Sequence, residues 1–193
     1  MNAYLTQLGV PPRLQTFFAA EELHFDYGNE LEHVSATCHR VPTTSMLWTA
    51  GSPLAKEVII TFSVMEAIAF MTINQWAFQQ LDNLLFVATG NRIHTGQMKW
   101  IRDNLKQRVF TLVFGDDLIS RITDVKVALA IRNKQVKLEA QHGLILARLK
   151  QKAAAFEEDH FSLSVFEKEF GIRTRVRTCK PVHHLTFYDQ LKT

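Results

Sequence analysis

The sequence predicts a single α/β domain over residues 1–193, built on a mostly parallel sheet flanked by helices. Apolar runs of strand length alternate with helical patterns through the middle of the chain. This order is typical of parallel strands joined by helical crossovers. Hydrophobic residues make up 47% of the chain and charged residues 21%, as in an ordinary globular protein with a sizeable core. We expect that core at 55–142, an N-terminal helix and hairpin extension at 1–54, and a mixed C-terminal extension at 143–193.

The N-terminal extension carries a helical pattern followed by an alternating one. Residues 1–23 are predicted to be helical, with a break at Gly9–Pro12 where a proline can occupy the first turn of a second helix. Residues 24–41 alternate between apolar and polar, and Gly28-Asn29 is a turn signal. A β-hairpin or small meander is therefore expected in this stretch. Loops are expected at 42–45 and 51–53.

The middle of the chain alternates strand and helix. Its strand patterns are continuous apolar runs, and its helical patterns place apolar residues three or four positions apart. Short crossovers between parallel strands are almost always right-handed. The carboxyl ends of these strands should therefore meet at one crevice, where α/β proteins build their sites. Strands are expected at 57–62, 84–88, 109–114 and 136–140, and helices at 64–80, 95–106 and 117–132.

The C-terminal extension gives weaker signals. A helix is expected at 144–158 from the spacing of its leucines and alanines. Ser162 or Ser164 can cap a short helix at 165–170, which Gly171 would end. Residues 172–178 are expected to be extended, and residues 185–191 to form one or two helical turns.

Charge and cysteine use narrow the class of protein without naming a function. The net charge is +3 and the sequence pI is about 8.9, which is compatible with a nucleic-acid partner but does not require one. Cys38 and Cys179 stand in no metal-binding spacing and are expected to be reduced thiols of a cytoplasmic protein. We find no signal peptide and no Walker loop, nucleophile elbow or HExxH motif. No apolar run approaches the roughly 18 residues of a membrane span, so no membrane association is expected.

Two strand-to-helix junctions resemble those of the Toprim domain, the metal-binding α/β module of primases, topoisomerases and related nucleases. The family's first strand ends in Glu-Gly/Ser-x-x-Asp-Ala, where this chain has Phe62–Ala67. The family's third strand ends in Asp-x-Asp-x-x-Gly-Arg, where this chain has Gly115–Arg121. Thr89-Gly90-Asn91 matches the glycine after the family's middle strand, and the tail 185–191 resembles its closing segment. The resemblance covers about 55–142 and is closest to small Toprim-like proteins of mobile elements.

The departures from the family pattern bear on activity. The family uses the first-strand glutamate as an acid, a base or a metal ligand, and an aspartate pair to hold Mg²⁺. Phe62 stands at the glutamate position and Gly115 at that of the first aspartate. Because phenylalanine can neither transfer a proton nor coordinate a metal, we expect a degenerate Toprim-like protein without catalysis or cofactor. The resemblance implies a binding module in DNA mobilisation, replication or repair.

Two other hypotheses stay open at this stage. Glu66, Asp116 and Asp117 remain near the crevice and are candidate catalytic residues and ligands of a rearranged Mg²⁺ site. Such a site would make the protein a phosphoryl-transfer enzyme of the nuclease or primase kind. In the third hypothesis the chain binds a protein partner of a mobilisation or replication complex and no nucleic acid. Simpler roles also exist, because Asp117 can cap the following helix and Glu66 is favourable in a first helical turn.

A basic run in the C-terminal extension is the best candidate for contact with DNA or RNA. Arg173, Arg175 and Arg177 alternate, so that an extended backbone places all three on one face. Guanidinium groups match phosphate geometry, and Lys180 and Arg121 join the candidate set. The alternatives are an edge strand protected by charge for the arginine run, and a salt bridge to Asp117 for Arg121.

Overall fold

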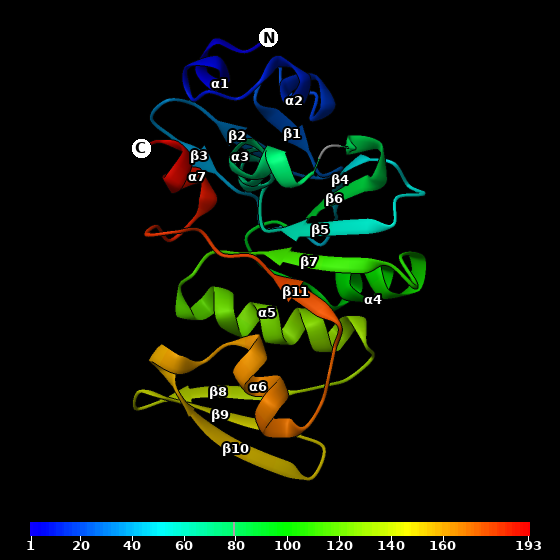
Figure 1. Cartoon of the computed structure of the whole chain (residues 1–193), viewed down its shortest axis with the longest axis vertical. Coiled ribbons are helices and arrows are strands. Elements are labelled where there is room, and N and C mark those ends of the chain that lie inside the picture. The colour runs from blue at the N-terminus through cyan, green and yellow to red at the C-terminus, as the bar shows by residue number, and fades with distance from the viewer. Residues whose placement is uncertain (79) are drawn as a thin grey trace.

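A five-stranded sheet crosses the middle of the molecule in the order β11-β7-β5-β6-β4 (Figure 1). The structure is a computed structural model that describes residues 1–78 and 80–193. Neighbours β11 and β7, β7 and β5, and β5 and β6 are parallel, whereas β4 runs antiparallel to β6. The strands span Trp48–Gly51 (β4), Glu57–Thr61 (β5), Leu84–Ala88 (β6), Val109–Val113 (β7) and Val176–Thr178 (β11).

Helices cover both faces of this sheet, which explains its continuous apolar strands. Val58 and Ile60 of β5 belong to the core beneath the helices α4 and α5, and Ile59 belongs to the core beneath α3. These helices span Val64–Asn74 (α3), Thr95–Asn104 (α4) and Leu118–Ile131 (α5). The helix predicted at 64–80 therefore ends early, and Gln75–Ala77 (η1) and Leu81–Asn83 (η2) are short 3-10 turns. Residue 79 of that prediction lies outside the described part of the chain.

The N-terminal extension packs on the α3 side of the sheet. Its two predicted helices are present at Ala3–Gln7 (α1) and Pro12–Phe17 (α2). The predicted meander is present as an antiparallel three-stranded sheet. Its strands span His24–Asp26 (β1), Leu31–Val34 (β2) and His39–Arg40 (β3).

The helix predicted at 144–158 is wrong. An antiparallel meander occupies this stretch, made of Lys137–Gln141 (β8), Leu144–Leu149 (β9) and Lys152–Glu157 (β10). Burial in β9 alternates strictly, because its side chains have a period of two. The strand predicted at 136–140 is real, but it pairs within this meander and not with the central sheet.

The chain returns from the meander to the central sheet through Glu158–His160 (η3) and Leu163–Phe170 (α6). Ser162 caps α6 and Gly171 ends it in the left-handed conformation at φ 63°, as predicted. After β11, the helix Phe187–Leu191 (α7) packs beside α3.

The α/β class is confirmed, but the sheets are mixed or antiparallel. The central sheet is mixed because β4 joins it antiparallel at the β6 edge, and the two smaller sheets are antiparallel. Among the described residues, no helix has both the length and the apolar character needed to cross a bilayer.

Candidate functional site

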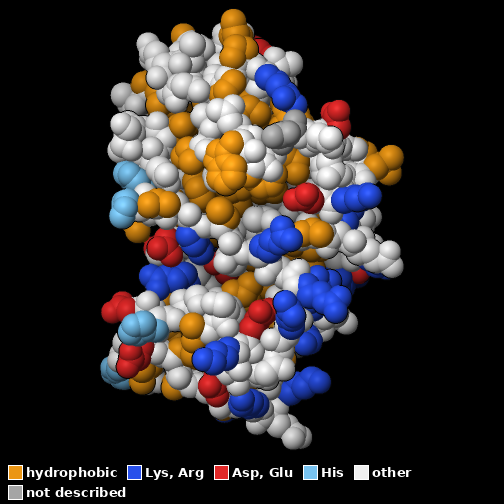
Figure 2. Space-filling view, in the orientation of Figure 1, with side chains coloured by type: hydrophobic (Ala, Val, Ile, Leu, Met, Phe, Trp, Pro, Cys, Tyr) orange, Lys and Arg blue, Asp and Glu red, His pale blue; other side chains and the backbone are white. Residues whose placement is uncertain are grey.

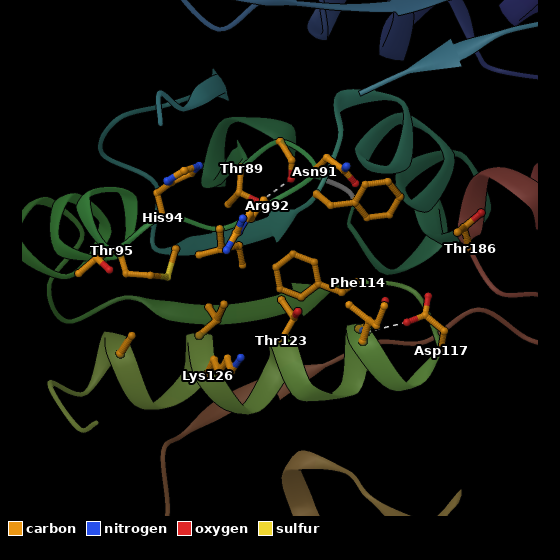
Figure 3. A pocket seen from close by; sticks show the side chains of 18 residues that line it. Thr89, Asn91, Arg92, His94, Thr95, Phe114, Asp117, Thr123, Lys126 and Thr186 are labelled. Atoms are coloured by element: carbon orange, nitrogen blue, oxygen red, sulfur yellow. Dashed lines mark hydrogen bonds between the residues drawn. The ribbon is translucent and has the colours of Figure 1, made fainter. Parts of the chain in front are cut away.

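A cleft of about 630 Å³ opens beyond the carboxyl ends of β5, β6 and β7, at the crevice expected from the sequence (Figure 3). Phe62 and Phe114 follow β5 and β7, and the segment 89–95 follows β6. One face of α5 closes the opposite side. The polar side chains that line the cleft are Thr89, Asn91, Arg92, His94, Thr95, Asp117, Ser120, Thr123, Lys126 and Thr186.

Neither position where the family carries an acidic residue holds one here: position 62 is a phenylalanine and position 115 is a glycine. Phe62 is half-buried at the wall of the cleft. At Gly115, an added Cβ would lie 2.6 Å from the carbonyl oxygen of Leu185 and 3.1 Å from Oγ of Ser120. The same carbonyl accepts a hydrogen bond of 2.9 Å from the backbone N–H of Asp116. The segment before α7 therefore occupies the space that an aspartate at 115 would need.

Glu66 is fully buried and acts as a cap for α7. Its carboxylate accepts hydrogen bonds from the backbone N–H groups of Phe187 at 2.7 Å and Tyr188 at 3.0 Å. Burial raises the pKa of the Glu66 carboxyl to about 7, against the opposing effect of these two N–H donors. The sequence correctly placed Glu66 in the first turn of a helix, but its partners lie 121 residues further on.

The predicted metal site of Glu66, Asp116 and Asp117 is not assembled. Asp117 caps α5 by accepting the N–H of Ser120 at 2.7 Å, the simpler role considered for it from the sequence. Oδ1 of Asp116 lies 3.7 Å from Nε of Arg121. No three His, Cys, Asp or Glu side chains come together for a metal ion in the described part of the chain. The physical reason is that each of the three carboxylates is used on a different partner.

Two of the basic candidates have structural roles. Arg121 pairs with Asp116 and not with Asp117, and it donates to the carbonyl oxygens of Glu158 and Asp159, which ties α5 to η3. Lys180 places Nζ 2.6 Å from Oδ2 of the buried Asp124 and donates to the carbonyl of Gly115. Both side chains are half-buried and engaged. We therefore leave both out of the proposed nucleic-acid surface.

Asp124 was missed by sequence reasoning, because it occurs in a helical pattern without any motif. Burial raises the pKa of its carboxyl to about 6, and the neighbouring ammonium of Lys180 opposes this rise. The pair fastens the segment after β11 to α5. We interpret Asp124 and Lys180 as a structural ion pair, in which one carboxylate oxygen of Asp124 contacts the ammonium of Lys180.

Glu32 was also missed, although it lies at the carboxyl end of β5. This buried carboxylate accepts the N–H groups of Val64 at 2.8 Å and Met65 at 3.1 Å, which begin α3. Tyr27 donates its hydroxyl to the same carboxylate at 2.9 Å, and a ring nitrogen of His39 lies 2.9 Å away. The sequence did contain one signal for this role, because Glu32 occupies an inward-facing position of an alternating strand, where an apolar residue is expected. The N-terminus of α3, a type of site that can bind phosphate, is therefore occupied by the Glu32 carboxylate of the N-terminal extension.

The three arginines of the C-terminal run are exposed, but the extended backbone predicted at 172–178 is a strand only at Val176–Thr178. Arg175 has a left-handed backbone at φ 56°, so the three side chains do not lie on one face of a continuous strand. Thr174 and Val176 between them are buried. Arg132 at the end of α5 donates to the carbonyl oxygens of Thr174 and Arg175, and Arg102 of α4 donates to Asn133 at 2.7 Å. Figure 2 shows Lys and Arg side chains gathered beside the start of β11 and the end of α5. We call the following set the arginine surface: Arg102, Arg132, Arg173, Arg175 and Arg177.

Comparison with known proteins gave no relative. A scan against models of protein families, a search of curated proteins and a search of solved structures each found no match to this chain. The resemblance to Toprim domains therefore rests on the strand-end residues alone.

Proposed function

We propose that this protein is a non-catalytic, Toprim-like nucleic-acid-binding module of the cytoplasm that serves DNA mobilisation, replication or repair. The observation that carries the proposal is the exposure of three neighbouring arginines, Arg173, Arg175 and Arg177. These side chains are exposed, and none has a hydrogen-bond or ion-pair partner among the described residues. Exposed guanidinium groups without a partner, one on β11 and two on the segment just before it, are suited to a phosphate backbone.

The scaffold supports the Toprim-like part of the proposal. Four of the five central strands, β5, β6, β7 and β11, run parallel, and the family's acidic positions fall at the ends of β5 and β7. Phe62 and Gly115 stand there.

The use of the remaining carboxylates supports the absence of catalysis. Glu66 holds α7, Asp117 holds α5, and Asp116 lies beside Arg121. Mg²⁺ in phosphoryl-transfer sites is usually held by one or two carboxylates together with substrate oxygens and water. A carboxylate that is fully buried on two backbone N–H groups is not free for that role. No specific observation favours the metal-dependent enzyme as a second candidate.

Binding measurements with a matched charge control test the proposal. Fluorescence anisotropy with short single- and double-stranded DNA and RNA should show binding that weakens as salt rises. The variant R173Q/R175Q/R177Q should bind more weakly, and its salt slope should fall by about 3, one for each lost phosphate contact. The control R40Q/K56Q/K168Q removes equal charge from exposed positions on β3, before β5 and on α6. It should leave the slope nearly unchanged.

Three results would contradict the proposal. Absence of binding, or equal loss in both triple variants, would favour a module that binds a protein partner. Cleavage of DNA or primer synthesis by the purified chain in Mn²⁺ would favour a metal-dependent enzyme.

A further inference from the structure

We infer that the cleft at the carboxyl ends of β5, β6 and β7 binds one nucleotide unit, with its phosphate between Arg92 and Lys126 and its base against the aromatic wall. This site uses none of the residues of the arginine surface. Nucleotide binding in the cleft therefore does not depend on whether the arginine surface binds a nucleic-acid chain.

Two uncompensated cations face one hollow. Figure 3 shows Arg92 and Lys126 on opposite sides of the cleft, the first from the segment after β6 and the second from α5. Neither side chain has a hydrogen-bond or ion-pair partner in the part of the chain that the structure describes. The carboxylate of Asp117 also lines the cleft, but it is engaged by the N–H of Ser120. The cleft thus carries an excess of positive charge, which suits a phosphate group.

A helix N-terminus adds to this positive potential. The helix α4 is 10 residues long and begins at the cleft with His94 and Thr95. The helices α3, α5 and α7 each begin on a carboxylate, supplied by Glu32, Asp117 and Glu66. The first turn of α4 contains no acidic residue. His94 and Gln97 form a capping box at this terminus, so α4 adds its dipole, more than free N–H groups, to the positive potential around the two cations.

The remaining wall is apolar and aromatic. Phe62 and Phe114 line it together with Ile93, Met98 and Val127. Inorganic phosphate would gain nothing from contact with this apolar wall, and a purely apolar ligand would leave the two cations without a partner. A planar base joined to a phosphate satisfies both, because aromatic side chains stack on bases of any sequence. The volume of about 630 Å³ is within the usual range of small-molecule sites.

One polar atom of the wall lacks a partner. Nε2 of His94 is buried without a hydrogen bond among the described residues, although His94 itself is only half-buried. Because this nitrogen is not accessible from the cleft, we assign it no contact with the ligand. Asn91 and Thr123 supply further polar groups in the cleft for a sugar or base edge.

Calorimetry with AMP, GMP, CMP and UMP tests the inference. We expect saturable binding of one nucleotide per chain, with the matching nucleosides binding at least about tenfold more weakly, since they lack the charged hydrogen bonds. R92Q and K126Q should each weaken nucleotide binding by about tenfold or more for the same reason. The matched control is K99Q, an exposed lysine of α4 that does not line the cleft, and it should bind as the parent does. F62L should weaken nucleotide binding but leave inorganic phosphate binding unchanged.

A second set of ligands distinguishes the end of a nucleic-acid strand from a free nucleotide as the natural ligand. Tighter binding of a 5′-phosphorylated tetranucleotide than of its 5′-hydroxyl form and of the mononucleotide would assign the cleft to a strand end. Equal binding of mononucleotide and tetranucleotide would assign it to a free nucleotide. The variant R173Q/R175Q/R177Q should retain mononucleotide binding, which separates this inference from the proposed function. No saturable binding at millimolar nucleotide, equal binding of nucleoside and nucleotide, or unchanged binding in R92Q/K126Q would overturn it.

Discussion

Replacing Glu66 by glutamine should change how the stability of this protein depends on pH. The side chain is fully buried, and its carboxylate meets the N–H groups of Phe187 and Tyr188 at 2.7 and 3.0 Å. Glutamine keeps the shape and one acceptor oxygen but does not titrate. The comparison therefore isolates the proton-dependent part of what Glu66 contributes.

The direction and the size of this pH-dependent contribution to stability follow from the pKa of Glu66. Burial raises the pKa of Glu66 from 4.5 to about 7, so the folded chain holds this proton over a range in which the unfolded chain has released it. The stabilising contribution is complete below pH 4.5 and is lost as pH rises through about 7. The rise in pKa corresponds to about 3 kcal/mol in the free energy of unfolding. Asp124 titrates in both proteins, so its effect cancels in the difference between them.

Urea unfolding followed by tryptophan fluorescence measures this difference between pH 4.5 and 8. The free energy of unfolding of the parent minus that of E66Q should fall by about 3 kcal/mol across the interval, mostly between pH 5 and 7. The control E22Q, at an exposed glutamate, should follow the parent curve. A difference between parent and E66Q that stays constant with pH would refute the assignment of a raised pKa to Glu66.

Three further predictions follow from the same packing. Gly115→Asp should cost about 1–3 kcal/mol, because its Cβ would meet a backbone oxygen at 2.6 Å. Gly96→Ala, with open space around it, should be neutral or slightly stabilising. Thermal unfolding checks both, and a Mg²⁺-dependent rise in Tm for the parent chain would contradict the loss of the metal site. Asp124→Asn or Lys180→Met alone should cost about 3 kcal/mol by leaving a buried partner unpaired, whereas the double variant should recover much of this loss in urea unfolding. Glu32→Ala should expose the first N–H groups of α3 to faster hydrogen exchange, and unchanged exchange would argue against the cap.

The central strands could be predicted because each is a short apolar run bounded by polar turns. The crevice followed from the order of those strands, and the cap role of Asp117 followed from its place before α5. The helix predicted at 144–158 failed for a local reason. The run Ala153-Ala154-Ala155 has high helix propensity, but β10 gains more from pairing with β9 along its whole length.

The partners of the buried carboxylates could not be predicted from the sequence. Glu32 meets α3 across 32 and 33 residues, and Glu66 meets α7 across 121 and 122. Hydrogen bonds of this kind are set by how the elements pack, and neither residue occurs in a motif that announces its partner. Lys180 was assigned to phosphate for the same reason, since nothing in the sequence pairs it with Asp124.

The cap that Glu66 places on α7 also has a consequence for the order of folding. A contact between residues 121 positions apart closes a long loop, which is slow and entropically costly. Before α7 arrives, a buried Glu66 carboxylate would have no N–H partner, so α3 should keep this side chain in water until the sheet is complete. Docking of α7 would then be a late step. Variants at Glu66 should change the rate of unfolding more than the rate of the first folding phase.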